Sequence, residues 1–158
     1  MTVPPREDWP KPTRQTEGGA VLTDVVLATF RLNARLMEAA QDMAAHGGIT
    51  AAWWQVLGGV LDQPRSVAEA GRIMGVSRQA VQRIADLLVE RGLAEYRPNP
   101  AHRRAKLLAC TEAGYWAIRQ IALVQHPWTS ELGKSVELDD LRTTLATMQT
   151  LITKLEEG

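Results

Sequence analysis

A cluster of serine, glutamine and arginine side chains between residues 77 and 83 has the chemistry of a surface that contacts DNA. In the stretch VSRQAVQRIADLLVE, apolar residues recur at intervals of three and four, which predicts an amphipathic helix with one face toward a core. The opposite face collects Ser77, Arg78, Gln79, Gln82 and Arg83. Glutamine and arginine suit bidentate hydrogen bonds to adenine and guanine edges in a major groove. A solvated helix face is the commoner use of such residues, so the neighbouring segments must decide between these interpretations.

A short helix and a turn precede this amphipathic helix. Ser66 and Glu69 have the spacing of a capping box, and Gly75 is expected to end the helix that they open. A short helix, a turn with glycine and an amphipathic helix together form a helix-turn-helix. Thr50 is expected to cap an earlier helix, which contains a glycine pair at 58–59. Close approach of another backbone is one explanation for that pair.

After Gly92 the periodicity changes and predicts a β-hairpin. Strand candidates run from Leu93 to Arg97 and from Arg104 to Cys110, and the prolines between them belong in a turn. Arg103 and Arg104 lie on the far shoulder of this turn. A basic hairpin beside a recognition helix is a wing, whose arginines suit a minor groove or phosphates. The alternative is a solvated charged loop.

Charge is distributed unevenly along the chain. The 158 residues carry 18 basic and 18 acidic side chains in total. Between Asp62 and Cys110, however, nine Lys or Arg stand against five Asp or Glu. This asymmetry is typical of a local phosphate-binding face on an otherwise acidic protein. The length fits one ordinary domain, with some chain beyond a small DNA-binding unit.

Several classes of protein are disfavoured by what the sequence lacks. The single cysteine, Cys110, excludes an intramolecular disulfide, and no apolar run approaches a transmembrane helix or a signal peptide. We therefore expect a cytoplasmic protein without a membrane partner. His46, His102 and His126 are far apart, which predicts no metal site, and no cofactor is expected. No nucleophile motif, phosphate loop or acid–base pair indicates an enzyme.

Both ends of the chain predict helices with apolar faces to cover. Residues 1–19 are rich in proline and glycine and predict a disordered or loosely ordered arm. From Ala20 to about Ala45 the residues predict a helix with two apolar stripes, which needs two partners. Near the C-terminus a heptad seam is formed by Leu138, Leu141, Leu145, Met148, Ile152 and Leu155. Such a seam commonly packs on its own core, but beside a two-striped helix it favours a homodimer.

These segments resemble the MarR (multiple antibiotic resistance regulator) family of winged helix-turn-helix transcription factors. The resemblance rests on TAAWWQVLGGV, on SVAEAGRIMGVSRQAVQRIADLLVERGLAEY, and above all on NPAHRRAKLLACTEAG, which looks like the family's wing signature. It implies a mainly α fold and a single domain over residues 20–158. Residues 49–110 would form a winged helix-turn-helix lobe with a small β-hairpin wing. Residues 20–48 and 111–158 would form a helical dimerisation lobe.

Two departures from the family's pattern lie near the wing and in the helix that follows it. His102 and Asn99 stand where the family usually has acidic residues, so the usual acidic partner of Arg103 is missing. Thr111 is expected to cap a long helix, and Pro127 is expected to kink or interrupt it.

The resemblance implies a sequence-specific regulator of transcription that binds double-stranded DNA as a homodimer at a pseudo-palindromic operator. Repression is favoured over activation, because steric exclusion needs no further surface. We expect Arg78, Gln79 and Gln82 to contact base edges, Ser77 and Arg83 to contact phosphates or nearby bases, and Arg103 and Arg104 to act in the wing. The competing hypothesis is a winged-helix dimer that serves as a protein-interaction or ligand-capture module without operator binding.

A small aromatic or phenolic effector that releases the DNA is also implied by the resemblance. The candidate lining residues are Phe30, Trp53, Trp54, Tyr115 and Trp116. Ordinary core packing is the alternative for each of these aromatic side chains. For Cys110, a buried and inert thiol is expected rather than a redox switch.

Overall fold

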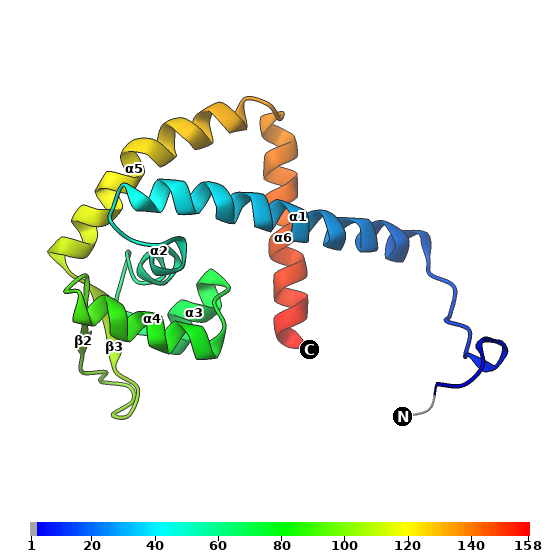
Figure 1. Cartoon of the computed structure of the whole chain (residues 1–158), viewed down its shortest axis with the longest axis horizontal. Helices are drawn as coiled ribbons and strands as arrows, with labels where there is room; N and C mark the ends of the chain where they lie inside the picture. Colours follow the sequence, from blue (N-terminus) through cyan, green and yellow to red (C-terminus); the bar gives the residue numbers. More distant parts are fainter. Residues whose placement is uncertain (1–2) are drawn as a thin grey trace. The chain divides into compact units, whose positions relative to one another are not determined.

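The computed structural model describes residues 3–158 and is mainly helical (Figure 1). Its elements in chain order are a 3-10 helix Arg6–Asp8, α1 Glu17–Ala45, α2 Ala51–Gly58, β1 Arg65–Ser66, α3 Val67–Met74, α4 Arg78–Glu90, β2 Ala94–Arg97, β3 Leu107–Cys110, α5 Glu112–Gly133 and α6 Leu138–Glu157. The mainly α fold with a small β wing is therefore confirmed. Over the described range, every helix is too short or too polar to cross a membrane.

The chain divides into two units, residues 1–39 and 40–158. The first unit holds the 3-10 helix and most of α1, which begins at Glu17, slightly before the expected start at Ala20. The hydroxyl oxygen of Thr16 accepts a hydrogen bond from the Gly19 amide at 3.0 Å, which satisfies a backbone donor at the start of the helix. Large apolar side chains of this unit are exposed: Val21, Leu22, Val25, Val26, Leu27, Phe30, Leu32 and Leu36.

The core of the second unit lies among α2, α3, α4 and the β-hairpin. The apolar stripe expected for the amphipathic helix is buried, as the periodicity predicts: Val81, Ile84, Ala85 and Leu88. It packs against side chains from α2 and the residues that follow it, and against Leu108 of β3. Because these side chains are almost fully removed from water, their burial fixes α4 with its polar face outward.

All four expected helix caps are present in this unit. The hydroxyl oxygens of Thr50, Ser66, Ser77 and Thr111 each accept a hydrogen bond from the backbone amide three residues further on. Each such cap stabilises a helix by about 1 kcal/mol. The starts of α2, α3, α4 and α5 were therefore predictable from the sequence alone.

The sheet is antiparallel, with strand order β1–β3–β2. In the hairpin, Ala94 pairs with Cys110 and Arg97 pairs with Leu107. The second strand was expected to begin at Arg104 but begins at Leu107, because β2 ends at Arg97 and the next residue, Pro98, has no amide hydrogen to donate. Strand β1, which pairs with β3, was not predicted.

Two other local expectations are refined by the structure. A Cβ on Gly59 would lie 2.9 Å from the Ala70 carbonyl oxygen, so close backbone approach explains this glycine, whereas Gly58 faces only the end of the Met74 side chain at 3.6 Å. The expected interruption at Pro127 is absent, since α5 is continuous through it. Near the proline, the Thr129 hydroxyl donates to the Gln125 carbonyl oxygen at 3.0 Å.

Candidate nucleic-acid interface

The polar face of α4 is fully available at the surface. Ser77, Arg78, Gln79, Gln82 and Arg83 are all exposed. The Ser77 oxygen accepts the capping hydrogen bond from the Ala80 amide at 3.3 Å, so its own hydroxyl hydrogen stays free to donate. Because the opposite face of α4 is buried in the core, the helix backbone that carries these side chains is held in one orientation.

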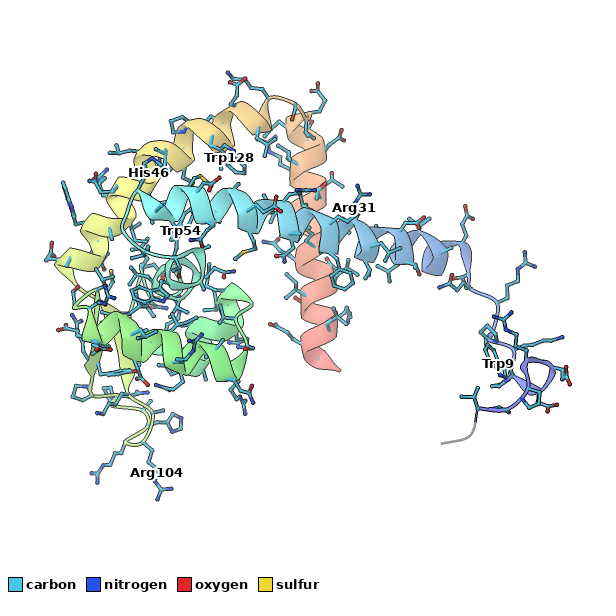
Figure 2. The ribbon with its side chains drawn as sticks, in the orientation of Figure 1. Trp9, Arg31, His46, Trp54, Arg104 and Trp128 are labelled. Atoms are coloured by element: carbon cyan, nitrogen blue, oxygen red, sulfur yellow. The ribbon has the colours of Figure 1, made fainter. Side chains whose placement is uncertain are left out.

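The wing loop between β2 and β3 carries the next two candidate residues, Arg103 and Arg104. Both are exposed, and Figure 2 shows Arg104 near the end of the loop with its side chain directed away from the helices. Within the loop, the Asn99 side-chain oxygen accepts a hydrogen bond from the Ala101 amide at 3.0 Å. This local turn shapes the loop through a neutral side chain, so it gives Arg103 no counter-charge.

Basic side chains in this region fall into two groups according to their acidic partners. Three arginines between Asp62 and Cys110 form ion pairs with acidic residues: Arg65, Arg72 and Arg97. Within residues 3–158, no ion pair involves five others: Arg78, Arg83, Arg103, Arg104 and Lys106. All five are exposed and lie on α4 or the wing. Their charge is therefore not neutralised by the protein and is available for phosphates.

A hollow of about 490 Å³ lies between α4, the start of α3 and the wing. Gln82 of α4 and Arg104 of the wing both line it, together with Lys106. A neighbouring hollow of about 550 Å³ is lined by Arg103 and again by Lys106. Of the α4 candidates, the structure thus brings Gln82 to a hollow that it shares with Arg104 and that adjoins the one lined by Arg103.

Three side chains at this hollow form a hydrogen-bonded cluster that sequence reasoning missed. The Tyr96 hydroxyl donates to Asp86 Oδ1 at 2.5 Å, and Gln82 Nε2 donates to the Tyr96 oxygen at 3.0 Å and to Asp86 Oδ1 at 3.1 Å. Partial burial and the bond to Asp86 raise the pKa of Tyr96 to about 12. The ammonium of Lys106 lies 5.8 Å from the centre of the Tyr96 ring. The spacing of Gln82 and Asp86, four residues apart on a helix, was the available signal.

The aromatic candidates for effector binding have different surroundings. Trp53 is half-buried on the core, with the Arg91 guanidinium 5.7 Å from its ring, and the Tyr115 hydroxyl donates to the Leu61 carbonyl oxygen at 3.1 Å. Trp54 is half-buried, whereas Trp116 is 66% exposed. Phe30, in the unit of residues 1–39, is also exposed. The packing of Trp53 and the bond of Tyr115 give these two a structural role of their own.

Cys110 is buried at the end of β3, where burial and the nearby Glu112 carboxylate raise the pKa of its thiol to about 11. We expect the folded protein to react with a thiol reagent at pH 8 at least about a hundredfold more slowly than an ordinary cysteine, because thiolate is the reactive form. The same chain unfolded in urea should react at the ordinary rate. Equal rates in the two states would contradict the burial of this thiol. In the described part of the chain, no cluster of His, Cys, Asp and Glu is suited to a metal ion.

Comparison with known proteins gives a consistent result. The model of the MarR family matches residues 47–105. An uncharacterized protein of Mycobacterium tuberculosis is 36% identical over 132 residues, covering 84% of this chain and 92% of that protein. CouR from Rhodococcus jostii RHA1, solved with p-coumaroyl-CoA, has a TM-score of 0.72 at 20% identity, covering 82% of this chain and 92% of CouR. The transcriptional repressor CouR bound to a 23-mer DNA duplex has a TM-score of 0.67 at 23% identity, covering 87% and 99% of the two chains.

Proposed function

Because this chain belongs to the MarR family, whose members are transcription regulators rather than enzymes, we propose that it binds operator DNA as a homodimer. Occupying a promoter would make it a repressor by steric exclusion. In this proposal α4 enters the major groove, where Arg78, Gln79 and Gln82 contact base edges. Ser77 and Arg83 contact phosphates or nearby bases, and Arg103 and Arg104 contact the minor groove or phosphates beside it.

The observation that carries the proposal is the uncompensated charge on α4 and the wing. Among the described residues 3–158, five exposed cations form no ion pair, although the whole chain has as many acidic as basic residues: Arg78, Arg83, Arg103, Arg104 and Lys106. Phosphate binding releases condensed counterions from DNA and so gains free energy from each such cation.

A second copy of the chain is the partner that we propose for the exposed apolar side chains of α1 and α6. On α6 the heptad residues Leu138, Leu141, Leu145, Ile152 and Leu155 are exposed within their own protomer. A seam of this period matches another helix. A twofold dimer would place its two α4 helices in half-sites about one helical turn apart on a pseudo-palindromic operator.

A small aromatic effector is the last part of the proposal. It is supported by the solved complex of CouR with p-coumaroyl-CoA and by the Trp116 ring, a large apolar surface that is 66% exposed. A screen of aromatic carboxylic acids, read out as release of bound operator, tests it. Release by none of them would remove the effector from the proposal and leave operator binding untouched.

The proposal is tested by measuring binding to DNA from upstream of the protein's own gene over a range of salt concentrations. We expect the double variant Arg103→Ala/Arg104→Ala to weaken binding to all sequences. It should also reduce the slope of log affinity against log salt by about 1.8, since each lost phosphate contact contributes about 0.9. Lys134→Ala/Arg142→Ala, which removes the same two positive charges from cations paired with Glu131 and Asp139, is the matched control and should leave the slope unchanged.

Two other outcomes would count against operator binding. Weak binding that is indifferent to sequence and to the wing substitutions would favour the protein-interaction or ligand-capture module. Equal losses in the wing variant and in Lys134→Ala/Arg142→Ala would show that total charge, rather than the wing, governs binding.

A further inference from the structure

The hydrogen-bonded cluster at Gln82 leaves part of its amide group free. The two acceptors, the Tyr96 oxygen and Asp86 Oδ1, are only 2.5 Å apart, and Gln82 Nε2 lies 3.0 and 3.1 Å from them. Because the two N–H bonds of an amide diverge by about 120°, acceptors so close together share one hydrogen rather than taking one each. One N–H and the carbonyl oxygen of Gln82 therefore stay available.

The orientation of this amide follows from the charge of Asp86. If the amide were turned over, Gln82 Oε1 would face a carboxylate oxygen and a hydroxyl that already donates to that carboxylate. All the facing atoms would then be acceptors, so the turned orientation is disfavoured. A bidentate contact requires that the shared hydrogen be the one on the side of the Gln82 stem, which leaves the outer hydrogen free. The outer hydrogen and Oε1 then lie on the same edge of the amide.

We propose that Tyr96 and Asp86 are positioning residues that hold Gln82 for bidentate recognition of adenine. The outer amide edge offers one donor and one acceptor, which match adenine N7 and the adenine 6-amino group in the major groove. A flexible glutamine must lose rotamer freedom when it binds a base, whereas one that is already held does not. The inference rests on the proposed operator binding and adds a specific base and the residues that select it.

The surroundings of the cluster fit this role. Gln82 and Asp86 are exposed, while Tyr96 is half-buried and comes from β2, at the base of the wing. The cluster lines the same hollow as Arg104 and Lys106, the cations that we assign to the DNA phosphates. The ammonium of Lys106 lies 5.8 Å from the centre of the Tyr96 ring, so the wing and the reading helix meet at Tyr96.

The test is selection of binding sequences from a random DNA library by the full-length protein and its variants. The operator position at which Gln82→Ala loses its preference identifies the base contacted by Gln82. At that position the wild type is expected to prefer adenine. Tyr96→Phe should reduce this preference at least about threefold and leave the preferences at the other positions unchanged. Ser135→Ala removes a hydroxyl that donates to the Leu132 carbonyl oxygen just after α5, away from α4 and the wing in the sequence, and should change none of them.

A double-mutant cycle separates positioning from a general structural effect. If Tyr96 acts through Gln82, Tyr96→Phe should have no effect on this base preference in the Gln82→Ala background. An equal effect in both backgrounds, or no effect in either, would overturn the inference while operator binding stands. The inference would also be overturned if the wild type preferred another base at that position, or if Gln82→Ala weakened the base preference at no position of the operator. If the wild type enriches no sequence at all, the proposed function itself fails.

Discussion

Replacing Gly114 by alanine is expected to reduce the free energy of unfolding by about 3 kcal/mol or more, one of the largest effects available from a single methyl group in this chain. Gly114 lies in the first turn of α5, where an added Cβ would lie 2.2 Å from the Leu93 carbonyl oxygen and 2.7 Å from Cys110 Sγ. The carbonyl cannot move away without cost, because it accepts a hydrogen bond from the Thr111 amide at 3.2 Å. Urea unfolding followed by circular dichroism measures the loss.

Gly133→Ala is the matched control, since Gly133 belongs to the same helix and its Cβ would meet no atom within 4 Å. Alanine is the better helix former, so we expect this variant to be unchanged or up to about 1 kcal/mol more stable. If both variants unfolded at the same urea concentration as the wild type, the close contact between α5 and the loop before β2 would not exist in solution.

The parts of the fold that were predictable depend on information local in sequence. The buried stripe of α4 repeats at helical spacing, and each of the caps at Ser66, Ser77 and Thr111 needs a bond to an amide only three residues away. The order of these elements was enough to predict a helix-turn-helix with a wing. The apolar heptad of α6 was readable for the same reason.

The parts that were not predictable depend on pairing between distant residues. Strand β1 contains only Arg65 and Ser66, which are too few to show the alternation of apolar and polar residues that marks a strand. It forms because it pairs with β3, which follows the helix-turn-helix in the sequence whereas β1 precedes it. The start of β3 at Leu107 likewise follows from where β2 ends. In the Gln82 cluster, Asp86 was visible at helical spacing, whereas Tyr96 joins only because the hairpin folds against α4.

The polar face of α4 shows a related limit of sequence reasoning. Residue type alone placed Arg78, Gln79 and Gln82 in one group of base-contacting candidates. The structure separates them, because only Gln82 has its amide held by side chains from two elements. A side chain that is already ordered before binding is a better candidate for specificity than one that must be ordered by the DNA. We therefore expect substitutions of Gln82 to alter sequence preference more than those of Gln79.

The other large effect that we expect is the loss of dimerisation on replacing Leu145 by aspartate. Leu145 is 57% exposed within its own protomer and lies in the apolar seam of α6, so the substitution leaves the protomer's core intact. In a twofold dimer, however, it would bury two carboxylates in an apolar interface, at a cost of several kcal/mol. The dimer dissociation constant should rise at least about a hundredfold, which sedimentation velocity would detect as a monomer.

Operator affinity should fall with dimerisation, because a single protomer binds one half-site and loses the effective concentration that its partner supplies. Thr143→Asp is the control: it adds the same charge to the same helix, two residues away and so on the opposite face from Leu145. We expect this variant to stay dimeric and to bind DNA like the wild type. A Leu145→Asp monomer with unchanged operator affinity would show that one protomer suffices for recognition. A persistent dimer would instead place the interface elsewhere, and the exposed apolar residues of α1 would then be the next to substitute.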